Sequence, residues 1–122
     1  MDKEKKKALA AEYVMAARPA GVYRVVHEAT GKSFVGATAD LNAMRNRLDF
    51  EMNMGASMKK ALLADWKTYG ADAFRYEVLE TFKPPEDGRY NLMKELERME
   101  TEWLERLQPY GNKGYNRPPI QT

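Results

Sequence analysis

Two short stretches near the start of this chain, residues 22–27 and 33–35, are dominated by Val, Tyr and Phe. Such residues suit a pleated, half-buried surface, and residues 29–32 between them include a glycine that supplies a tight turn. The pattern therefore predicts a β-hairpin. Because apolar side chains fall on both faces of residues 22–27, we expect this strand to be covered on both sides.

Helical spacing dominates most of the remaining chain. Apolar residues recur at steps of three and four, which predicts helices over residues 2–17, 40–52, 57–69 and 90–107, and residues 74–79 alternate as a third strand. The stripes expected to be buried are Leu9 and Tyr13; Leu41, Met44, Leu48 and Met52; Met58, Leu62, Trp66 and Tyr69; and Leu92, Leu96, Met99, Trp103 and Leu107, widened by Met93 and Leu104.

This order of elements predicts one small domain of the α/β (α+β) class. Two strands joined by a hairpin are antiparallel, so we expect a sandwich with a central three-stranded antiparallel sheet flanked by helices. Residues 20–116 form the expected core of a single domain over residues 1–122, and residues 1–18 form an N-terminal helical extension. Neither an internal repeat nor a linker marks a second domain.

The composition is that of a soluble globular protein, with 43% hydrophobic and 31% charged residues. The sequence has no apolar run of the roughly 20 residues needed to cross a bilayer. Its lysine-rich start is not followed by the apolar segment of a secretory signal, so we expect a cytoplasmic protein with no membrane partner. The absence of cysteine excludes disulfides and Cys-based zinc sites. A net charge of +2 is too small to indicate nucleic-acid binding by itself.

One carboxylate falls on the apolar side of the final predicted helix. At about 100° per residue, Glu100 projects between Leu107 and Met93, whereas the other carboxylates of this helix lie at or beyond the edges of the apolar arc. Burying a lone carboxylate costs several kcal/mol unless a positive group compensates it. The sequence leaves three interpretations open: a boundary residue on a rotated helix, a structural ion pair with an arginine, or a functional site such as a metal ligand.

Two glycine tripeptides mark the ends of the predicted hairpin, Gly21-Val22-Tyr23 and Phe34-Val35-Gly36. Together with several later segments they resemble the GIY-YIG nuclease family over nearly all of residues 21–116. The pattern is most similar to a small bacterial subgroup whose GIY-YIG domain also occurs in some LuxR-like regulators. The other matching segments are Gly31-Lys32, Gly55…Leu62…Asp65-Trp66…Tyr69-Gly70…Phe74, Glu77-Val78-Leu79-Glu80, Glu100-Thr101-Glu102-Trp103-Leu104-Glu105 and Lys113-Gly114-Tyr115-Asn116.

The resemblance implies a metal-dependent endonuclease that hydrolyses phosphodiester bonds in DNA with one Mg²⁺ or Mn²⁺ ion. In this family the first tripeptide's tyrosine lies beside the attacking water, a helix arginine stabilises phosphate charge, and a glutamate on the last helix holds the metal. The implied catalytic residues are Tyr23, Arg47 and Glu100, with Glu100 as the metal ligand. The expected partner is nucleic acid, and the expected state is a monomer or a weak homodimer. The implied substrate-binding residues are Lys32, Phe34, Arg45, Lys59 and Asn116.

Helix geometry favours Arg47 as the arginine of this set. The usual family position falls on Met44, and Arg47 lies one helical turn later on nearly the same face, so its long side chain can reach the same region. Arg45 lies about 160° from Arg47 around the helix.

Four positions depart from the family pattern. Phe34 replaces the second tripeptide's tyrosine, and Leu48, Ser57 and Lys59 stand where histidine, histidine and asparagine are common. The single histidine, His27, ends the first strand, and we expect a polar strand end there rather than a catalytic group. Because an acid–base group contributes about 10²–10⁴-fold to a rate, these losses leave an alternative open. It is a catalytically weakened domain that acts as a nucleic-acid-binding or protein-interaction module.

Overall fold

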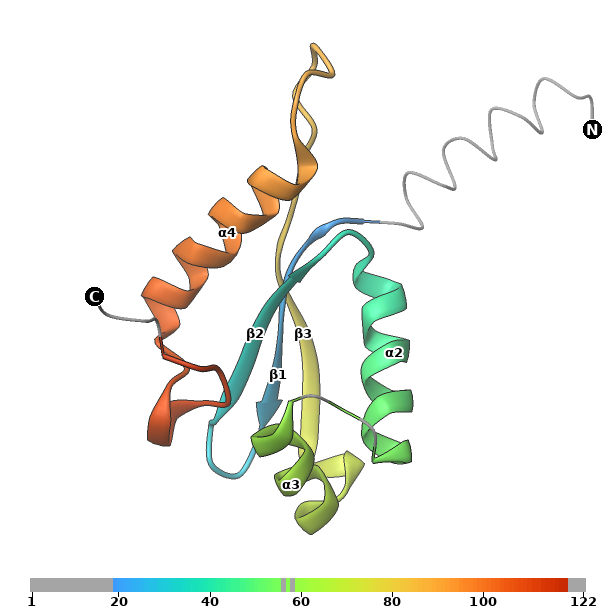
Figure 1. Cartoon of the computed structure of the whole chain (residues 1–122), viewed down its shortest axis with the longest axis vertical. Coiled ribbons are helices and arrows are strands. Elements are labelled where there is room, and N and C mark those ends of the chain that lie inside the picture. Colours follow the sequence, from blue (N-terminus) through green and yellow to red (C-terminus); the bar gives the residue numbers. More distant parts are fainter. Residues whose placement is uncertain (1–18, 56, 58, 119–122) are drawn as a thin grey trace, which may run out of the picture.

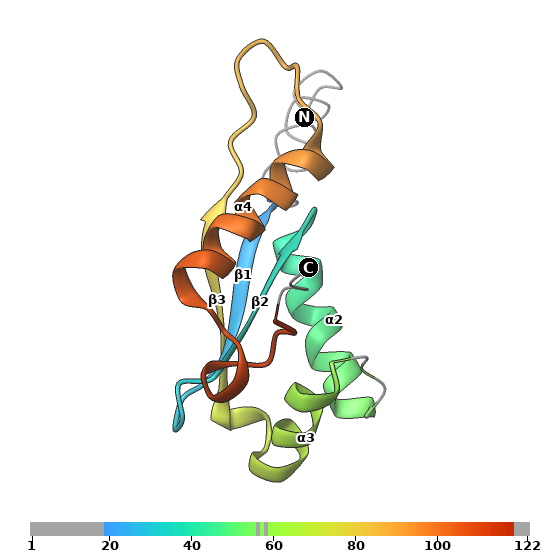
Figure 2. The same ribbon diagram turned by 60° about the vertical axis from the view of Figure 1, so that its left-hand side comes forward.

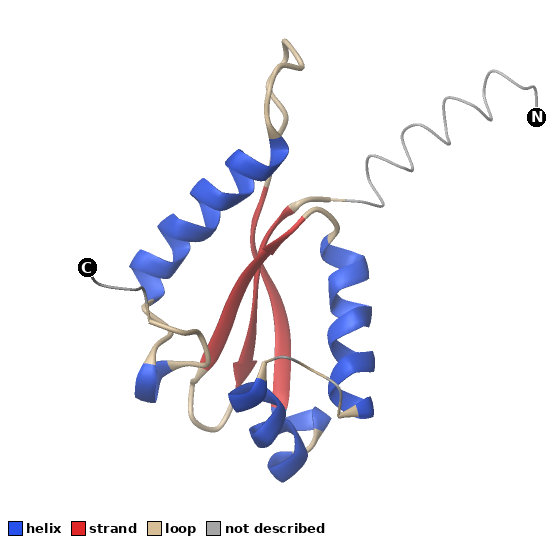
Figure 3. Cartoon of the chain, in the orientation of Figure 1, coloured by secondary structure: helices blue, strands red, loops and turns tan. Residues whose placement is uncertain are grey.

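The structure of this protein is a computed structural model in which residues 19–55, 57 and 59–118 are described, so the helix expected over residues 2–17 lies outside the described residues. Within them, the strands β1 (Gly21–His27), β2 (Ser33–Thr38) and β3 (Phe74–Thr81) form one antiparallel sheet in the order β2-β1-β3. β1 is therefore the central strand, and the sheet is strongly twisted (Figures 1 and 3).

Helices cover both faces of this sheet. α2 (Leu41–Met54) and α3 (Lys60–Tyr69) pack on one face, and α4 (Leu92–Leu107) packs on the other (Figures 1 and 2). Two 3₁₀ turns, Ala71–Ala73 and Gly111–Lys113, complete the elements of the described residues. The expected α+β fold with a three-stranded antiparallel sheet is thus confirmed. None of the described helices is both long and apolar enough to span a membrane.

The alternation of side chains along β1 divides the apolar core into two clusters. Tyr23 and Val25 point to α2 and α3, while Val22 points to α4 together with Val35 of β2. Six of the seven residues of β1 are buried, as its apolar positions on both faces predicted. The first cluster is completed by Leu41, Leu48, Met52, Leu62, Leu63 and Trp66, and the second by Ala20, Leu96 and Met99.

Two helix starts differ from the prediction. α3 begins at Lys60 rather than at residue 57, because the Ser57 hydroxyl accepts a hydrogen bond from the backbone N–H of Lys59 (3.1 Å) in a turn that precedes the helix. α4 begins at Leu92 rather than at residue 90, because the Asn91 side chain caps it by accepting a hydrogen bond from an N–H of its first turn (3.1 Å).

Two residues of the predicted apolar stripes are exposed. Tyr69 is 56% exposed, because it lies in the last turn of α3, where its ring covers the end of β1 rather than entering the core between helix and sheet. Met93 is 72% exposed in the first turn of α4, where it borders a surface pocket. Leu63, outside the predicted stripe, is buried because α3 packs against both the sheet and α2.

His27 ends β1 as expected, but its side chain lies in the core. It is 1% exposed, and its ring packs against Tyr69 and Phe74, with centroid distances of 4.6 and 4.9 Å. Its Nδ1 lies 2.7 Å from Thr30 Oγ1, and its Nε2 has no hydrogen-bond partner in the described part of the chain. These contacts give His27 a packing role at the hairpin end of the sheet, where the sequence predicted a polar residue at the end of the strand.

Candidate active site

Tyr23 lies across two strands of the sheet. Its backbone belongs to the central strand β1, directly opposite Gly36 of β2. The side chain is 2% exposed and leans over Gly36, so that a Cβ on Gly36 would lie 2.6 Å from Tyr23 Oη. The ring also stacks on Tyr76 of β3, with centroids 5.4 Å apart. None of the hydrogen bonds among the described residues uses the Tyr23 hydroxyl.

The outer edge of β2 is closed by two side chains and by the backbone of the C-terminal segment, where the Tyr115 N–H donates a hydrogen bond to the Ser33 carbonyl (2.9 Å). Glu100 of α4 accepts a hydrogen bond from the backbone N–H of Ala37 through Oε2 (3.0 Å). The Asn116 amide makes two bonds to Val35: its Oδ1 accepts from the backbone N–H and its Nδ2 donates to the carbonyl, both at 2.8 Å. Unpaired backbone groups on an edge strand are costly when buried. Glu100 and Asn116 therefore fix the position of β2 beside Tyr23.

Charged groups from two helices, α2 and α4, influence the Tyr23 hydroxyl. Burial raises the pKa of Tyr23 above its usual range, and Tyr76 and the carboxylates of Glu100 and Glu51 raise this pKa further. The Arg47 cation lowers the same pKa. Arg47 of α2 and Glu100 of α4 thus both act electrostatically on the Tyr23 hydroxyl, which links the three residues implied as catalytic.

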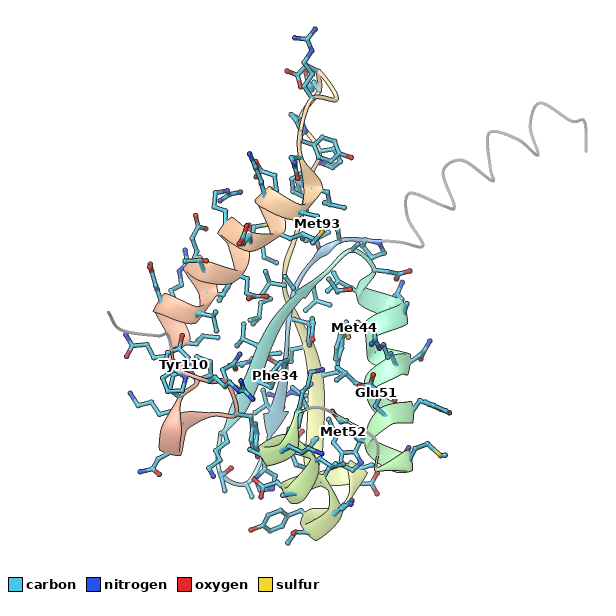
Figure 4. The ribbon with its side chains drawn as sticks, viewed as in Figure 1. Phe34, Met44, Glu51, Met52, Met93 and Tyr110 are labelled. Atoms are coloured by element: carbon cyan, nitrogen blue, oxygen red, sulfur yellow. The ribbon has the colours of Figure 1, made fainter. Side chains whose placement is uncertain are left out.

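Glu51 is a residue of this region that sequence reasoning missed. It accepts a hydrogen bond from Arg47 Nε at 2.9 Å, across one turn of α2. The Glu51 side chain is 22% exposed, whereas that of Arg47 is 70% exposed. Figure 4 shows Glu51 and Met44 on the side of α2 that is turned toward the sheet. The four-residue spacing of Arg47 and Glu51 is the sequence signal that identifies such a pair.

The cost of burying the Glu100 carboxylate is offset by a group that none of the three sequence interpretations included. Burial raises the pKa of Glu100, the hydrogen bond from the backbone of Ala37 lowers it, and nearby Glu97 raises it. Among the described residues Glu100 forms no salt bridge, and its partner is a backbone N–H rather than the arginine of the ion-pair interpretation. Its second oxygen, Oε1, takes part in none of the hydrogen bonds between described residues.

The donor set around Glu100 fits a weakly held hard cation. No group of three or more His, Asp or Glu side chains in the described residues is arranged to hold a metal ion. Mg²⁺ typically keeps several waters and binds through one or two carboxylates together with substrate phosphates. Glu100 fits that pattern, and beside it lies a surface pocket of about 370 Å³ bordered by Ala37, Thr38, Ala39, Met93, Leu96, Glu97 and Glu100.

Both of the lysines implied as substrate-binding, Lys32 and Lys59, lie on the face of the sheet that carries Tyr23. Lys59 Nζ lies 5.3 Å from the centroid of the Phe34 ring, which itself lies 6.3 Å from the Tyr23 ring. Near the hairpin turn, Lys32 Nζ lies 5.8 Å from the centroid of the Tyr115 ring. Phe34 lies in β2, Lys32 directly precedes this strand, and Lys59 of the turn before α3 lies over the Phe34 ring.

Arg45 and Asn116 are placed differently from this group. Arg45 lies on the other side of α2, in a pocket with Arg75 and Tyr76, and it counteracts the rise that burial causes in the pKa of Tyr76. Both amide atoms of Asn116 are engaged by the backbone of Val35. The geometry thus gives Asn116 a structural contact at the site and places Arg45 beside Tyr76, whose ring stacks on that of Tyr23.

Comparison with solved structures identifies the fold. The chain is similar to the catalytic domain of the homing endonuclease I-TevI, with a TM-score of 0.66 and 20% identity over 82% of this chain and 99% of that one. A mutant of the catalytic domain of the same intron endonuclease, with a glutamate replaced by alanine, gives a TM-score of 0.65 and 19% identity over 80% of this chain and 92% of that one. No protein-family model matches this chain, and no curated protein matches it by sequence.

Proposed function

Since the chain has the fold of a GIY-YIG nuclease, we propose that it is an endonuclease that hydrolyses phosphodiester bonds in DNA with the help of one Mg²⁺ or Mn²⁺ ion. The observation that carries this proposal is the convergence of three side chains from separate elements. Tyr23 of β1 leans over Gly36 of β2, Glu100 of α4 accepts a hydrogen bond from Ala37 of the same strand, and both Arg47 of α2 and Glu100 influence the pKa of Tyr23. A guanidinium stabilises charge on a phosphate, a carboxylate can hold a metal ion, and a phenol can orient the attacking water, so these groups suit such a hydrolysis.

Each residue has a distinct role in the proposed reaction. Water attacks the phosphorus, a new P–O bond forms, and the sugar oxygen leaves and takes up a proton. Negative charge develops on the phosphate oxygens, where the Arg47 cation stabilises it. Glu100 would hold the metal ion, which would supply Lewis-acid chemistry when bound. Because burial raises its pKa, Tyr23 acts as a neutral phenol that orients the attacking water by a hydrogen bond.

The lysines beside Tyr23 supply binding energy rather than chemistry. Lys32 and Lys59 lie along β2, and phosphate contacts from such residues position a nucleic acid without reading its sequence. We propose that a DNA strand follows β2 past Phe34 toward Glu100. The exposed Arg47 side chain reaches the same strand from α2.

The decisive experiment compares the wild type with Glu100→Gln. A glutamine oxygen still accepts the hydrogen bond from Ala37, so the edge of β2 stays closed while the charge needed to hold a cation is lost. Supercoiled plasmid and branched oligonucleotides are incubated with each protein in Mg²⁺, Mn²⁺ or EDTA. We expect the wild type to cut only with metal and Glu100→Gln not to cut. Glu105→Gln, an exposed change on the same helix, is the control and should behave as the wild type. Equal cutting by wild type and Glu100→Gln would refute the proposal.

A second candidate is a catalytically weakened domain that binds nucleic acid without cutting it. Leu48 and Ser57 stand where the family pattern commonly has histidine, and both are buried, at 3% and 2% exposure. Leu48 belongs to the core, and the Ser57 hydroxyl accepts a hydrogen bond from Lys59, so neither supplies acid–base chemistry. In this case the wild type binds DNA with an affinity that falls steeply as salt rises, but it does not cut with either metal.

A further inference from the structure

The ion pair between Arg47 and Glu51 uses only one edge of the guanidinium group. Arg47 donates from Nε to Glu51 Oε1 at 2.9 Å. No other hydrogen bond or ion pair of Arg47 occurs among the described residues. The two terminal nitrogens, Nη1 and Nη2, therefore keep their N–H donors available. Two parallel N–H donors are the arrangement that binds phosphate in a bidentate manner.

We infer that Glu51 is a positioning residue, which holds Arg47 by its Nε so that the terminal nitrogens of the guanidinium face a substrate phosphate. This inference rests on the proposed function of the site. If the inference holds, Arg47 binds a substrate phosphate through two guanidinium nitrogens. Glu51 then orients Arg47 and does not itself contact the substrate.

The difference in burial between the two side chains supports this assignment. An ordinary i, i+4 pair on a helix surface leaves both partners in solvent and contributes little. Here Glu51 is 22% exposed and Arg47 is 70% exposed, so the carboxylate is held against the protein while the cation extends outward. Glu51 is thus the fixed partner, and Arg47 is the partner whose direction it sets.

The position of Glu51 relative to Tyr23 supports it independently. The Glu51 carboxylate raises the pKa of the Tyr23 hydroxyl, and the Arg47 cation lowers it. Glu51 also lies on the side of α2 that is turned toward the sheet (Figure 4), so its carboxylate is not on the outer face of the helix. A carboxylate at this place would repel a substrate phosphate if Arg47 did not neutralise it. An orienting role for Glu51 explains why a carboxylate stands beside a proposed phosphate site.

Met44 explains why this chain needs such an arrangement. The usual family arginine position falls on Met44, which is half-buried and packs against the cluster that contains Tyr23. Arg47 starts one turn further along α2, at a position from which a flexible side chain has many directions open to it. Fixing one of its nitrogens restricts these directions, and a misplacement of about 1 Å in a catalytic group can cost about 100-fold in rate.

The test separates orientation from simple charge. Cleavage of a DNA substrate is measured for the wild type, Glu51→Ala, Arg47→Ala and the double variant, with kcat and KM determined for each. Removing the Glu51 carboxylate also removes a repulsion, so we expect KM to stay equal or fall while kcat drops by about tenfold to a hundredfold. In the Arg47→Ala background, Glu51→Ala should leave kcat unchanged, because there is no guanidinium left to orient.

Two further variants exclude trivial explanations. Glu51→Gln keeps an acceptor oxygen for Arg47 Nε, and we expect it to lose at most about threefold in kcat, because a neutral acceptor still orients the guanidinium. Glu102→Gln removes one partner of a comparable exposed pair with Arg98 on α4 and should leave kcat unchanged. The inference would be overturned if Glu51→Ala lowered the thermal midpoint and also lowered kcat in the Arg47→Ala background, because the effect would then be structural. An unchanged or higher kcat in Glu51→Ala alone would overturn it as well.

A spectroscopic readout decides the inference even without cleavage. The Nε–Hε resonance of Arg47, assigned by its disappearance in Arg47→Lys, is recorded in ¹⁵N-labelled protein. We expect a distinct resonance in the wild type that shifts in Glu51→Ala. An identical position in both proteins would overturn the inference whatever the activity. If the wild type does not cut nucleic acid but this resonance depends on Glu51, the proposed endonuclease fails while the orientation of Arg47 by Glu51 stands.

Discussion

The hydroxyl of Tyr23 occupies the space that a side chain on Gly36 would fill. The two residues are cross-strand partners, and a Cβ on Gly36 would lie 2.6 Å from Tyr23 Oη and 2.8 Å from its Cζ. The two glycine tripeptides of the hairpin are thus one steric unit, because the glycine of the second lets the tyrosine of the first lie across β2. The missing hydroxyl at Phe34 leaves this unit intact.

Gly36→Ala tests this relationship. The added methyl group forces the Tyr23 ring out of its place, and overpacking of this kind costs about 1–3 kcal/mol. We expect the free energy of unfolding to fall by that amount in urea titrations, and cleavage to be lost because the hydroxyl is displaced. The control is the same change in a Tyr23→Ala background, where the space is free and the added methyl group should cost little. An equal cost in both backgrounds would contradict the steric explanation.

Tyr23→Phe separates the chemistry of the hydroxyl from the packing of the ring. The hydroxyl makes no hydrogen bond among the described residues, and the ring contacts with Tyr76 and Phe34 remain. We therefore expect the free energy of unfolding to change by less than about 0.5 kcal/mol, while the cleavage rate falls by about 10²-fold or more. Urea titration and single-turnover cleavage measure the two quantities. Full activity in Tyr23→Phe would remove Tyr23 from the proposed mechanism.

Sequence periodicity was sufficient for the sheet and for the faces of its strands. The hairpin, the third strand and the double burial of β1 follow from local patterns, and the structure has them. Residues at helix ends were less predictable. Tyr69 and Met93 fall on apolar stripes, but each lies in a terminal turn of its helix and is largely exposed there. Periodicity predicts which face of a helix is buried, but it does not predict how far along the helix the neighbouring element covers that face.

The partners of the site residues were beyond what the sequence alone can give. Glu100 was singled out correctly as a carboxylate that needs compensation, but its partner is a backbone N–H 63 residues earlier. Backbone groups have no signature in the sequence, since every residue except proline carries one. Asn116 was expected to contact substrate, and its bonds to Val35, 81 residues away, became visible only in the fold.

Asn116→Asp should destabilise the protein through the edge of β2. The aspartate keeps the acceptor for the Val35 N–H but loses the Nδ2 donor, so the Val35 carbonyl faces a carboxylate oxygen. Leaving a buried acceptor unpaired costs about 1–3 kcal/mol, and we expect a loss of that size in the free energy of unfolding at pH 7. Asn112→Asp, an exposed change in the same C-terminal segment, is the control and should be nearly neutral. If the two changes lowered the free energy of unfolding equally, Asn116 would have no special structural role at the edge of β2.

Glu77→Gln should show a pH-dependent loss of stability. The hydrogen bond from Arg24 lowers the pKa of Glu77, and Arg75 adds to the effect. A lowered pKa means that the folded state binds the proton less readily than the unfolded state, so the stabilisation is present above the unfolded pKa of about 4.3 and is lost as the pH falls through the folded pKa. We expect Glu77→Gln to cost about 1 kcal/mol or less at pH 7.

Urea titrations at a series of pH values measure this difference. The gap between the wild type and Glu77→Gln should be constant from pH 6 to pH 8 and should shrink below about pH 4. A gap that persists unchanged into acid would mean that Glu77 stabilises the sheet by packing and not by its ion pairs with Arg24 and Arg75.

Lys59→Gln should weaken DNA binding and reduce its dependence on salt. Lys59 Nζ lies over the Phe34 ring, on the face of the sheet that carries Tyr23. Each phosphate contact releases counterions, and losing one lowers the slope of log K against log[salt] by about 0.9 for duplex DNA. We expect that reduction in fluorescence-anisotropy titrations of a duplex at several salt concentrations. Lys94→Gln, an exposed change on α4, is the control and should keep the wild-type slope. An unchanged slope in Lys59→Gln would place the path of the DNA away from β2.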